Sequence, residues 1–254
     1  MPDALWSAAT GMLAQQTSMD ATANNLANVN TTGFKRGRTA FQDLLYTQLT
    51  PQQAARQGSQ VGAGTRVAGV QTQFEEGELQ QTGQPLDLAI QGDGFFEVNR
   101  PDGSKGYTRA GNFTTNAAGR LTTQDGNVVS PGVTIPANAS DISISAAGVV
   151  TATVAGKTTR LGQLSIATFQ NPYGLASAGG NTYNATAASG AARLGAPGAS
   201  GAGSITQGAL EGSNVNAVDE MVGMVATQRA YEAVSKVINA ADEMLGQANQ
   251  LRHG

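Results

Sequence analysis

Apolar side chains recur every seven residues along the first 30 positions of the chain. The repeat consists of Leu5, Met12, Met19 and Leu26. Such a narrow apolar seam is typical of a helix that packs against another helix. The pattern predicts a helix over residues 3–29, and Asn28, Asn30 and Gly33 are residue types that end helices.

The same spacing returns near the other end of the chain. Its members are Met224, Tyr231, Ile238 and Leu245. Asn216, with Asp219 three residues later, resembles a helix-capping pair, so a helix is expected over residues 217–251. We expect the two seams to pack on each other, either within one subunit or between subunits.

Both seams offer little apolar packing, because Met, Ala and Gln occupy positions where a bundle that is stable as a monomer carries Leu and Ile. The pattern alone is equally compatible with two amphipathic helices that cover the faces of an ordinary domain. We also expect helices of this kind to be poorly ordered in the free subunit and to fold on assembly.

The middle of the chain alternates apolar and polar residues in short runs between Gly, Pro and Asn turns, which is typical of a small all-β module. The expected strands cover residues 66–71, 86–90, 94–98, 106–109, 141–145, 148–154 and 164–169. Two other stretches, 46–65 and 178–204, show no sustained period. We expect them to be free linkers or disordered loops, or to be ordered only between subunits.

Together these patterns predict an α+β fold. It would have paired, coiled-coil-like terminal helices, a central all-β domain and an extended connecting arm. The expected parts are residues 1–33 and 214–254 for the paired helices, 34–66 for the arm and 67–213 for the β-rich domain.

Composition excludes much chemistry. Charged residues make up only 13% of the 254 residues, the net charge is -3, Cys is absent, and the one His is the penultimate residue, His253. Thiolate nucleophiles, disulfides, Cys-ligated metals and any mechanism with a His pair are therefore excluded. The chain lacks the basic patch of a nucleic-acid-binding protein, the positive start of a cleaved signal and an apolar stretch that could span a membrane.

Two motifs that suggest chemistry have plainer explanations. Gly156-Lys157-Thr158 lacks the upstream glycine of a phosphate-binding loop, and a Lys at a hairpin end accounts for it. Glu75, Glu76 and Glu78 suggest a glycosidase carboxylate pair, but the chain is poor in the aromatic residues that stack on sugars. Solvated strand ends explain these carboxylates better. We expect no catalytic residue, no cofactor and no metal.

Two long motifs lie near the two ends of the chain. The N-terminal motif contains Asn24, Asn25, Asn28, Gly33, Phe34 and Lys35. The C-terminal motif contains Ser213, Asn214, Val215, Gln228, Arg229, Tyr231 and Glu232. Both motifs resemble signatures of the flagellar basal-body rod and hook axial proteins. Residues 87–96 and 107–113 resemble the β domain of the same family, so the resemblance covers nearly the whole chain. It is closest to the distal-rod branch of the family.

The resemblance implies a structural subunit of the bacterial flagellar distal rod rather than an enzyme. Such subunits pair their terminal helices into an inner tube around a central channel, with the β domain outside. They assemble helically with copies of themselves into a rigid hollow shaft that transmits motor torque to the hook. The implied partners are proximal rod subunits, the hook protein, the surrounding outer ring proteins and the flagellar type III export apparatus, without nucleic acid or membrane insertion.

The resemblance also implies a place and a route: a rod that crosses the periplasm, reached by export without a cleaved signal peptide. Phe41 and Leu45 are spaced like the export motif of rod and hook substrates, although core packing would explain them equally well. The segment 46–65 would bridge neighbouring subunits and resist bending.

Three other functions stay open. A proximal rod or hook subunit is the nearest alternative. A secreted carbohydrate-active enzyme and an adhesin-like β module are alternatives of a different class.

Overall fold

The structure is a computed structural model of the chain, and it describes residues 2–44, 47–48, 60–62, 64–199 and 201–253. The chain divides into two compact units. We call the first the helical unit; it comprises Met1–Ala27, Gly37–Thr72 and Asn216–Gly254. The second, the β unit, comprises Asn28–Arg36 and Gln73–Val215.

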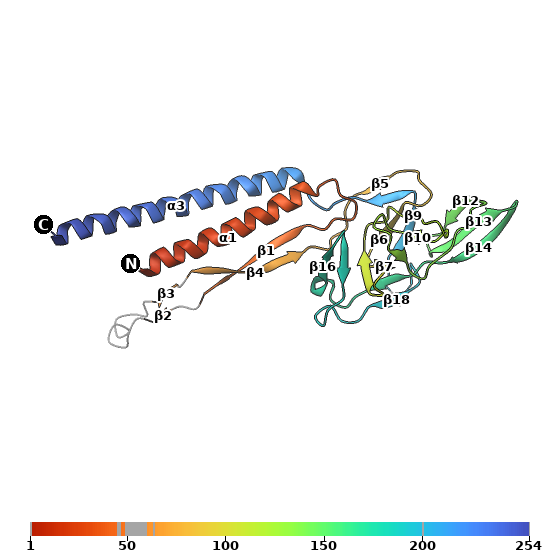
Figure 1. Cartoon of the computed structure of the whole chain (residues 1–254), viewed down its shortest axis with the longest axis horizontal. Helices are drawn as coiled ribbons and strands as arrows, with labels where there is room; N and C mark the ends of the chain where they lie inside the picture. The colour runs from red at the N-terminus through yellow and green to blue at the C-terminus, as the bar shows by residue number, and fades with distance from the viewer. Residues whose placement is uncertain (1, 45–46, 49–59, 63, 200, 254) are drawn as a thin grey trace. The chain divides into compact units, whose positions relative to one another are not determined.

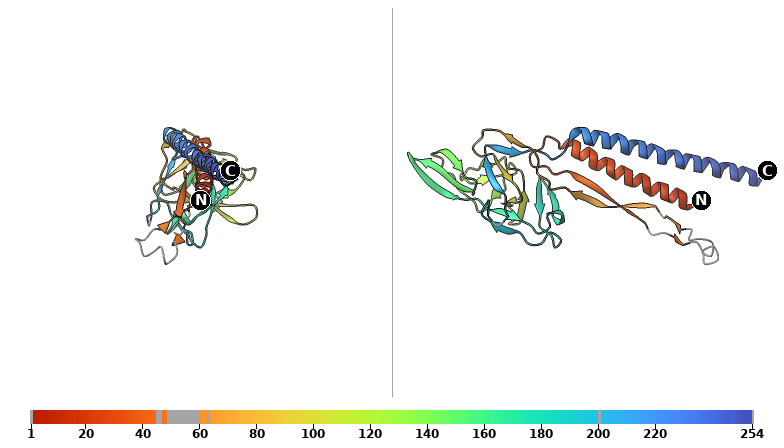
Figure 2. Two further views of the ribbon diagram at one scale, coloured as in Figure 1. Left: turned by 90° about the vertical axis from the view of Figure 1, so that its left-hand side faces the viewer. Right: turned by 180° about the vertical axis from the view of Figure 1, so that it is seen from behind.

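Two long helices form most of the helical unit: α1 over Pro2–Ala27 and α3 over Ala217–His253. Both predicted helices are therefore confirmed to within two residues at each end. The helices lie side by side and run in opposite directions (Figures 1 and 2). Asn216 caps α3, because its Oδ1 accepts a hydrogen bond of 3.0 Å from the Val218 N–H.

The residues of the two predicted seams differ in burial. Six are half-buried: Leu5, Met12, Met19, Leu26, Met224 and Ile238. Tyr231 is 39% exposed. The side chain of Leu245 lies outside the described part of the structure. The pairing of these seams residue by residue stays a prediction.

A two-stranded antiparallel ladder packs on α1, and α1 separates it from α3 (Figure 1). Its strands are β1 over Gly37–Asp43 and β4 over Thr65–Thr72. A short pair, β2 over Thr47–Gln48 and β3 over Gln60–Val61, lies between them in the chain. The strand expected at 66–71 is thus present as β4, but its partner is β1, within the stretch expected as an arm.

The β unit is built around one nine-stranded sheet with the order β16-β17-β8-β7-β11-β10-β9, in which β15 pairs with β7 and β18. Its members are β7 Phe95–Asn99, β8 Lys105–Thr108, β9 Thr114–Thr115, β10 Leu121–Thr122, β11 Val128–Val129, β15 Ile166–Thr168, β16 Ala176–Gly179, β17 Thr182–Asn184 and β18 Arg193–Gly195. A short 3-10 helix over Pro172–Gly174 connects β15 to β16.

Smaller ladders complete the β unit. The strands β12–β13–β14 form a three-stranded sheet, β19 pairs with β6, and β20 pairs with β5. Their bounds are β5 Leu79–Gln81, β6 Leu88–Gln91, β12 Ala139–Ile144, β13 Val149–Val154, β14 Lys157–Gln163, β19 Ser204–Gln207 and β20 Ala209–Glu211. Lys157 begins β14 directly after the Ala155-Gly156 turn, which confirms that it marks a hairpin end.

Two buried clusters hold the β unit together. The larger is mainly aliphatic, with Leu88, Ile90, Leu164, Ile166 and the ring of Phe96 at its fully buried centre. The smaller is aromatic and consists of Phe95, Tyr107 and Tyr183 with Phe74 and Phe169 at its edge. Its rings meet edge to face, as in the pair Tyr107–Phe169 with centroids 4.8 Å apart. Strands β6, β7, β8, β13 and β15 contribute residues to these clusters, because their alternating or continuous apolar runs fit a buried sheet.

The expectation of free linkers or disordered loops is wrong for part of the stretch 178–204, namely residues 178–179, 182–184 and 193–195. These residues form β17, β18 and the end of β16, all within the nine-stranded sheet. Small residues gave these strands no apolar alternation, and their backbone ladders with β8 and β15 hold them instead. Within the described residues, neither helix is apolar enough over a sufficient length to cross a membrane.

Candidate functional site

Three segments of the β unit meet in a network of backbone hydrogen bonds: residues 33–36, 73–78 and 211–214. The Gly33 N–H donates to the Glu211 carbonyl at 2.8 Å, and the Gln73 N–H donates to the Arg36 carbonyl at 2.8 Å. The Gly212 N–H donates to the Glu78 carbonyl at 2.8 Å. The end of the N-terminal motif and the start of the C-terminal motif therefore adjoin within the β unit.

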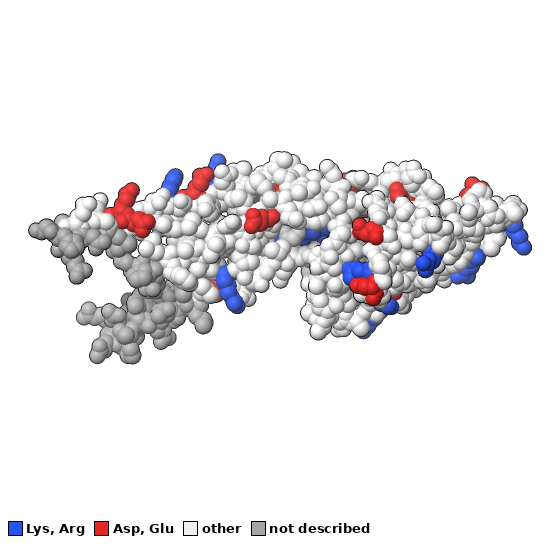
Figure 3. All heavy atoms as spheres, in the orientation of Figure 1, with Lys and Arg blue, Asp and Glu red and all other residues white. Residues whose placement is uncertain are grey.

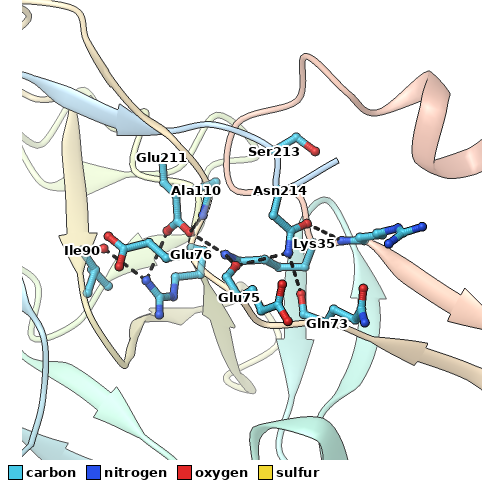
Figure 4. Close-up of polar contacts among 12 residues, drawn as sticks. Lys35, Gln73, Glu75, Glu76, Ile90, Ala110, Glu211, Ser213 and Asn214 are labelled. Carbon is cyan, nitrogen blue, oxygen red and sulfur yellow. Dashed lines mark hydrogen bonds and ion pairs between the residues drawn. The ribbon is translucent and has the colours of Figure 1, made fainter. Parts of the chain in front are cut away.

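Four side chains form what we call the polar cluster: Lys35, Glu211 and Asn214 of these segments, and Arg109 from the chain after β8. Figure 4 shows Lys35, Glu211 and Asn214. The Lys35 ammonium donates to Glu211 Oε1 and to the Glu75 carbonyl. The Arg109 Nη1 donates to Glu211 Oε2 at 3.2 Å. The side chains of Lys35 and Glu211 are fully buried, and that of Arg109 is 3% exposed.

The Glu211 carboxylate is the centre of the cluster. Besides both cations, it accepts a hydrogen bond of 3.1 Å from the Gly77 N–H. Arg109 in turn donates to the carbonyls of Ile90 at 3.2 Å and Gly92 at 2.7 Å. Removing charges from water is costly, and good geometry with further hydrogen bonds is what offsets that cost. The cluster thereby ties β20, β6 and the end of β8 to the N-terminal signature.

Burial changes the ionisation of two groups here. It lowers the pKa of Lys35 below its usual value, and the Glu211 carboxylate opposes this shift only in part. Burial also raises the pKa of Tyr183 to about 12, with a further contribution from the negative charge of Glu211. The cluster is therefore a low-dielectric site in which charge is held by specific partners.

The Asn214 side chain joins the segments 33–36 and 73–78 by hydrogen bonds. Its Oδ1 accepts from the Arg36 N–H at 2.7 Å, and its Nδ2 donates to the Gln73 carbonyl at 2.9 Å and to the Glu75 carbonyl at 3.2 Å (Figure 4). One amide side chain thus satisfies three backbone groups, for which an amide is suited because it both donates and accepts.

Gly33 passes very close to the backbone that follows β8. Its φ is +68°, and a Cβ at this position would lie 2.5 Å from the Ala110 nitrogen. Only glycine fits both the left-handed conformation and the close approach. This explains why a glycine stands at this position of the N-terminal signature.

A second polar contact lies within the helical unit. The Asn25 Nδ2 donates to Glu220 Oε2 at 3.2 Å and to the Gly37 carbonyl at 2.9 Å, while the Gly37 N–H donates to Asn25 Oδ1 at 2.9 Å. Asn25 and Glu220 are each 2% exposed. One asparagine therefore ties the last turn of α1, the first turn of α3 and the first residue of β1.

Most of the remaining signature residues lie nearer the surface. Asn28 Oδ1 accepts from the Thr31 hydroxyl, and the Phe34 carbonyl accepts from the Asn214 N–H. Ser213 Oγ accepts from the N–H of Val215, which is buried. The exposed or half-exposed ones on the helices are Asn24, Gln228, Arg229, Tyr231 and Glu232.

Of the two residues of the expected export motif, only Phe41 lies in the described part of the structure. Phe41 lies in β1 and is 47% exposed. Leu45 lies outside the described residues. The role of the pair stays a prediction.

Sequence reasoning missed the roles of Arg109, Glu211 and Glu220. A signal existed for Glu211, a charged residue in a short apolar run, but its partners Lys35 and Arg109 are 176 and 102 positions away. The chemistry of the polar cluster is structural, because the Glu211 carboxylate is occupied by three donors. Among the described residues, no group of three or more His, Asp or Glu side chains is arranged to hold a metal ion.

Three family models match the chain. They describe a flagella basal body rod protein over residues 5–35, a flagellar hook protein FlgE/F/G D1 domain over 89–152, and a flagellar basal body rod FlgEFG protein C-terminal region over 206–251. A relative named flagellar basal-body rod protein FlgG, from Caulobacter vibrioides, is 47% identical over 98% of this chain and 99% of its own length. The chain belongs to the flagellar basal-body rod protein family.

Other members of this rod family are similar over the same extent. The FlgG rod proteins of Borreliella burgdorferi and Agrobacterium fabrum are 44% and 47% identical, over 99% and 95% of this chain and 99% and 96% of their own lengths. The matched ends, 5–35 and 206–251, contain most of the polar cluster and both residues of the Asn25–Glu220 pair. The resemblance inferred from the two signature motifs is confirmed.

Proposed function

We propose that this chain is a structural subunit of the distal rod of the bacterial flagellar basal body. It assembles helically with copies of itself into a rigid hollow shaft that transmits motor torque to the hook. The observation that carries the proposal is the full-length similarity to proteins named FlgG basal-body rod proteins, at 42–47% identity for the first six relatives.

The geometry supports a mechanical role. A subunit that transmits torque must be rigid. The polar cluster joins three chain segments through buried ion pairs and amide hydrogen bonds. Each of these segments adjoins the helical unit in the sequence, at positions 36, 73 and 215. A load carried by the helices would therefore reach segments that are bonded to one another.

In this proposal residues 1–33 and 214–254 form the inner tube, 67–213 form the outer domain, and 34–66 connect them. The segment 46–65 would bridge neighbouring subunits and resist bending. The terminal helices would be poorly ordered in the free subunit and would pair as a coiled coil on assembly.

The proposal extends to partners and route. The chain would contact proximal rod subunits, the hook protein and outer ring proteins, and it would catalyse no reaction. It would reach the periplasm-crossing rod through the flagellar type III apparatus without a cleaved signal. Deleting residues 41–45 tests the export motif: retention of the variant inside the cell supports it, and normal export contradicts it.

Assembly is tested with the purified full chain. Concentrating it should give straight tubes with a central channel in electron micrographs. A monomer that stays dispersed at every concentration would contradict the proposal. A variant without residues 46–65 should give bent or hook-like polymers, and unchanged straight rods would count against the role of that segment.

The place in the rod is tested in Caulobacter vibrioides from which the 47% identical relative has been removed. Expression of this chain should restore full-length rods with hooks in isolated basal bodies. Rods that remain short would point to the proximal-rod alternative instead.

A further inference from the structure

The side of α3 that faces away from α1 is apolar in its first turns. Val218, Met221, Val222 and Val225 are 67%, 54%, 65% and 49% exposed. With Ala226 and Arg229, the last three of these line a surface depression. Charged side chains are spaced mainly over the part of α3 nearer the C-terminus, and the surface near the start of α3 is largely uncharged (Figure 3). We call this surface the α3 patch.

A second apolar surface lies on α1. Trp6 and Leu13 are 66% and 65% exposed. Seven residues are almost two helical turns, so these side chains lie on one face of the helix. The same face continues with polar or small residues toward the end of α1, including Gln16 and Asp20. We call Trp6 and Leu13 the α1 patch.

The two patches lie at different heights along the helical unit. The Asn25–Glu220 hydrogen bond sets the register of the antiparallel pair, so Leu13, twelve residues before Asn25, is level with Glu232, twelve residues after Glu220. Val218 is 14 residues before Glu232. At 1.5 Å per residue the matching members of the two patches, Leu13 with Val218 and Trp6 with Val225, are therefore offset by about 21 Å along the helix axis, so they do not meet within one chain.

The spacings of the patches match. Trp6 and Leu13 are seven residues apart, and so are Val218 and Val225. In an antiparallel contact Leu13 opposite Val218 places Trp6 opposite Val225. This register differs from the one within a chain by 14 residues, which is two repeats of the seven-residue seam.

We propose that the α3 patch of one copy receives the α1 patch of a second copy of this chain, displaced by two seven-residue repeats along the helix axis. The inference rests on the proposed function and names the contact by which copies join. A second copy is the fitting occupant, because the spacing of the α1 patch matches that of the α3 patch and both are apolar. The contact joins two different surfaces, so it repeats without closing and produces a filament rather than a dimer.

The absence of Cys makes the register testable by disulfide cross-linking of the full chain. Two variants place cysteines in the proposed register: Leu13→Cys with Val218→Cys, and Trp6→Cys with Val225→Cys. Two controls exchange the same positions: Leu13→Cys with Val225→Cys, and Trp6→Cys with Val218→Cys. The controls are out of register by seven residues, or about 10 Å, beyond the roughly 7 Å between Cα atoms that a disulfide spans.

Each variant is concentrated in reductant, checked for polymers by sedimentation, then oxidised and separated without reductant. The in-register variants should give ladders of dimers, trimers and larger species. The controls should give about tenfold less cross-linked chain, because their cysteines are too far apart. Circular dichroism before oxidation confirms that all four variants retain the helices of the unsubstituted chain.

The other outcomes are distinguishable. Ladders from the controls rather than the in-register pairs would overturn the register. Dimers from Val218→Cys alone would show that two α3 patches meet each other, and would overturn the proposal. Polymers without cross-links in any variant would overturn the patch contact and leave the proposed function standing. Failure of the unsubstituted chain to polymerise would contradict the proposed function and this contact with it.

Discussion

Lys35 and Glu211 form an ion pair in which neither side chain is exposed, although 176 positions separate them in the sequence. Arg109 shares the same carboxylate. Glu211→Gln would leave two buried cations without their anion, and we expect it to lower the free energy of unfolding by about 3–5 kcal/mol. Urea unfolding followed by the near-ultraviolet circular dichroism of the tyrosines measures this loss.

The matched control for that change is Lys157→Met, which removes a charge at an exposed hairpin end. It should change the free energy of unfolding by no more than about 0.5 kcal/mol. Equal urea midpoints for the two variants would show that the buried ion pairs contribute little to stability.

Gly33 allows a test of how much the close contact between its backbone and that of Ala110 contributes to stability. In Gly33→Ala the new Cβ would meet the Ala110 nitrogen at 2.5 Å in a left-handed conformation, so the chain must shift as well as bear strain. We expect a loss of about 2–4 kcal/mol in the free energy of unfolding. Gly103 also has a positive φ, +80°, but has nothing within 4 Å of its Cβ position. Gly103→Ala should cost only about 1–2 kcal/mol, and a cost as large as that of Gly33→Ala would contradict the role of the close approach.

Asn25 is expected to contribute strongly to the stability of the helical unit. Asn25→Ala removes three hydrogen bonds and leaves the Gly37 backbone groups without these partners, which should cost about 2–3 kcal/mol. Trp6 is the only tryptophan and lies in α1, so its fluorescence during urea unfolding of the assembled chain reports on this unit. Gln16→Ala, at an exposed position of the same helix, is the control and should leave the midpoint unchanged.

Tyr183 should make the free energy of unfolding decrease with pH in the alkaline range. Its pKa is raised to about 12 in the fold from an ordinary value of 10.0, so folding favours the neutral phenol. Its contribution is complete below pH 10, decreases as the unfolded chain ionises, and is lost as the pH rises through about 12. The decrease reaches about 2 kcal/mol by pH 12.

Tyr183→Phe should abolish this part of the alkaline loss. The free energy of unfolding, measured with urea from pH 8 to pH 12, should fall less steeply for the variant than for the unsubstituted chain. Parallel curves would mean that Tyr183 ionises equally easily in the folded and unfolded chains.

The helices were the most predictable part of the fold, because a seven-residue repeat sustained over several turns identifies a helix and its approximate ends. The strands with β-branched runs, such as β13 and β15, were predictable for a similar reason. Alternation indicates which face of a strand is buried but not which strand it pairs with. That is why β4 was expected but its partner β1 was not.

Only part of the candidate site could be predicted from the sequence. Gly33, Lys35 and Asn214 stood within signature motifs and could be singled out by resemblance. The pairing of Lys35 with Glu211, and of Asn25 with Glu220, depends on contacts across 176 and 195 positions, which no local pattern contains. Strand β16, Ala-Ser-Ala-Gly, has no apolar alternation at all and owes its place to the backbone ladder with β17.

The antiparallel pairing of α1 with α3 has a consequence for the order of folding. The β unit draws on residues that end at Val215, whereas the helical unit needs the last segment of the chain to cover α1. Closing a contact over nearly the whole chain length is entropically costly and slow unless the intervening residues are already compact. Prior folding of the β unit shortens that loop, so the first helix of the chain is among the last to find its partner.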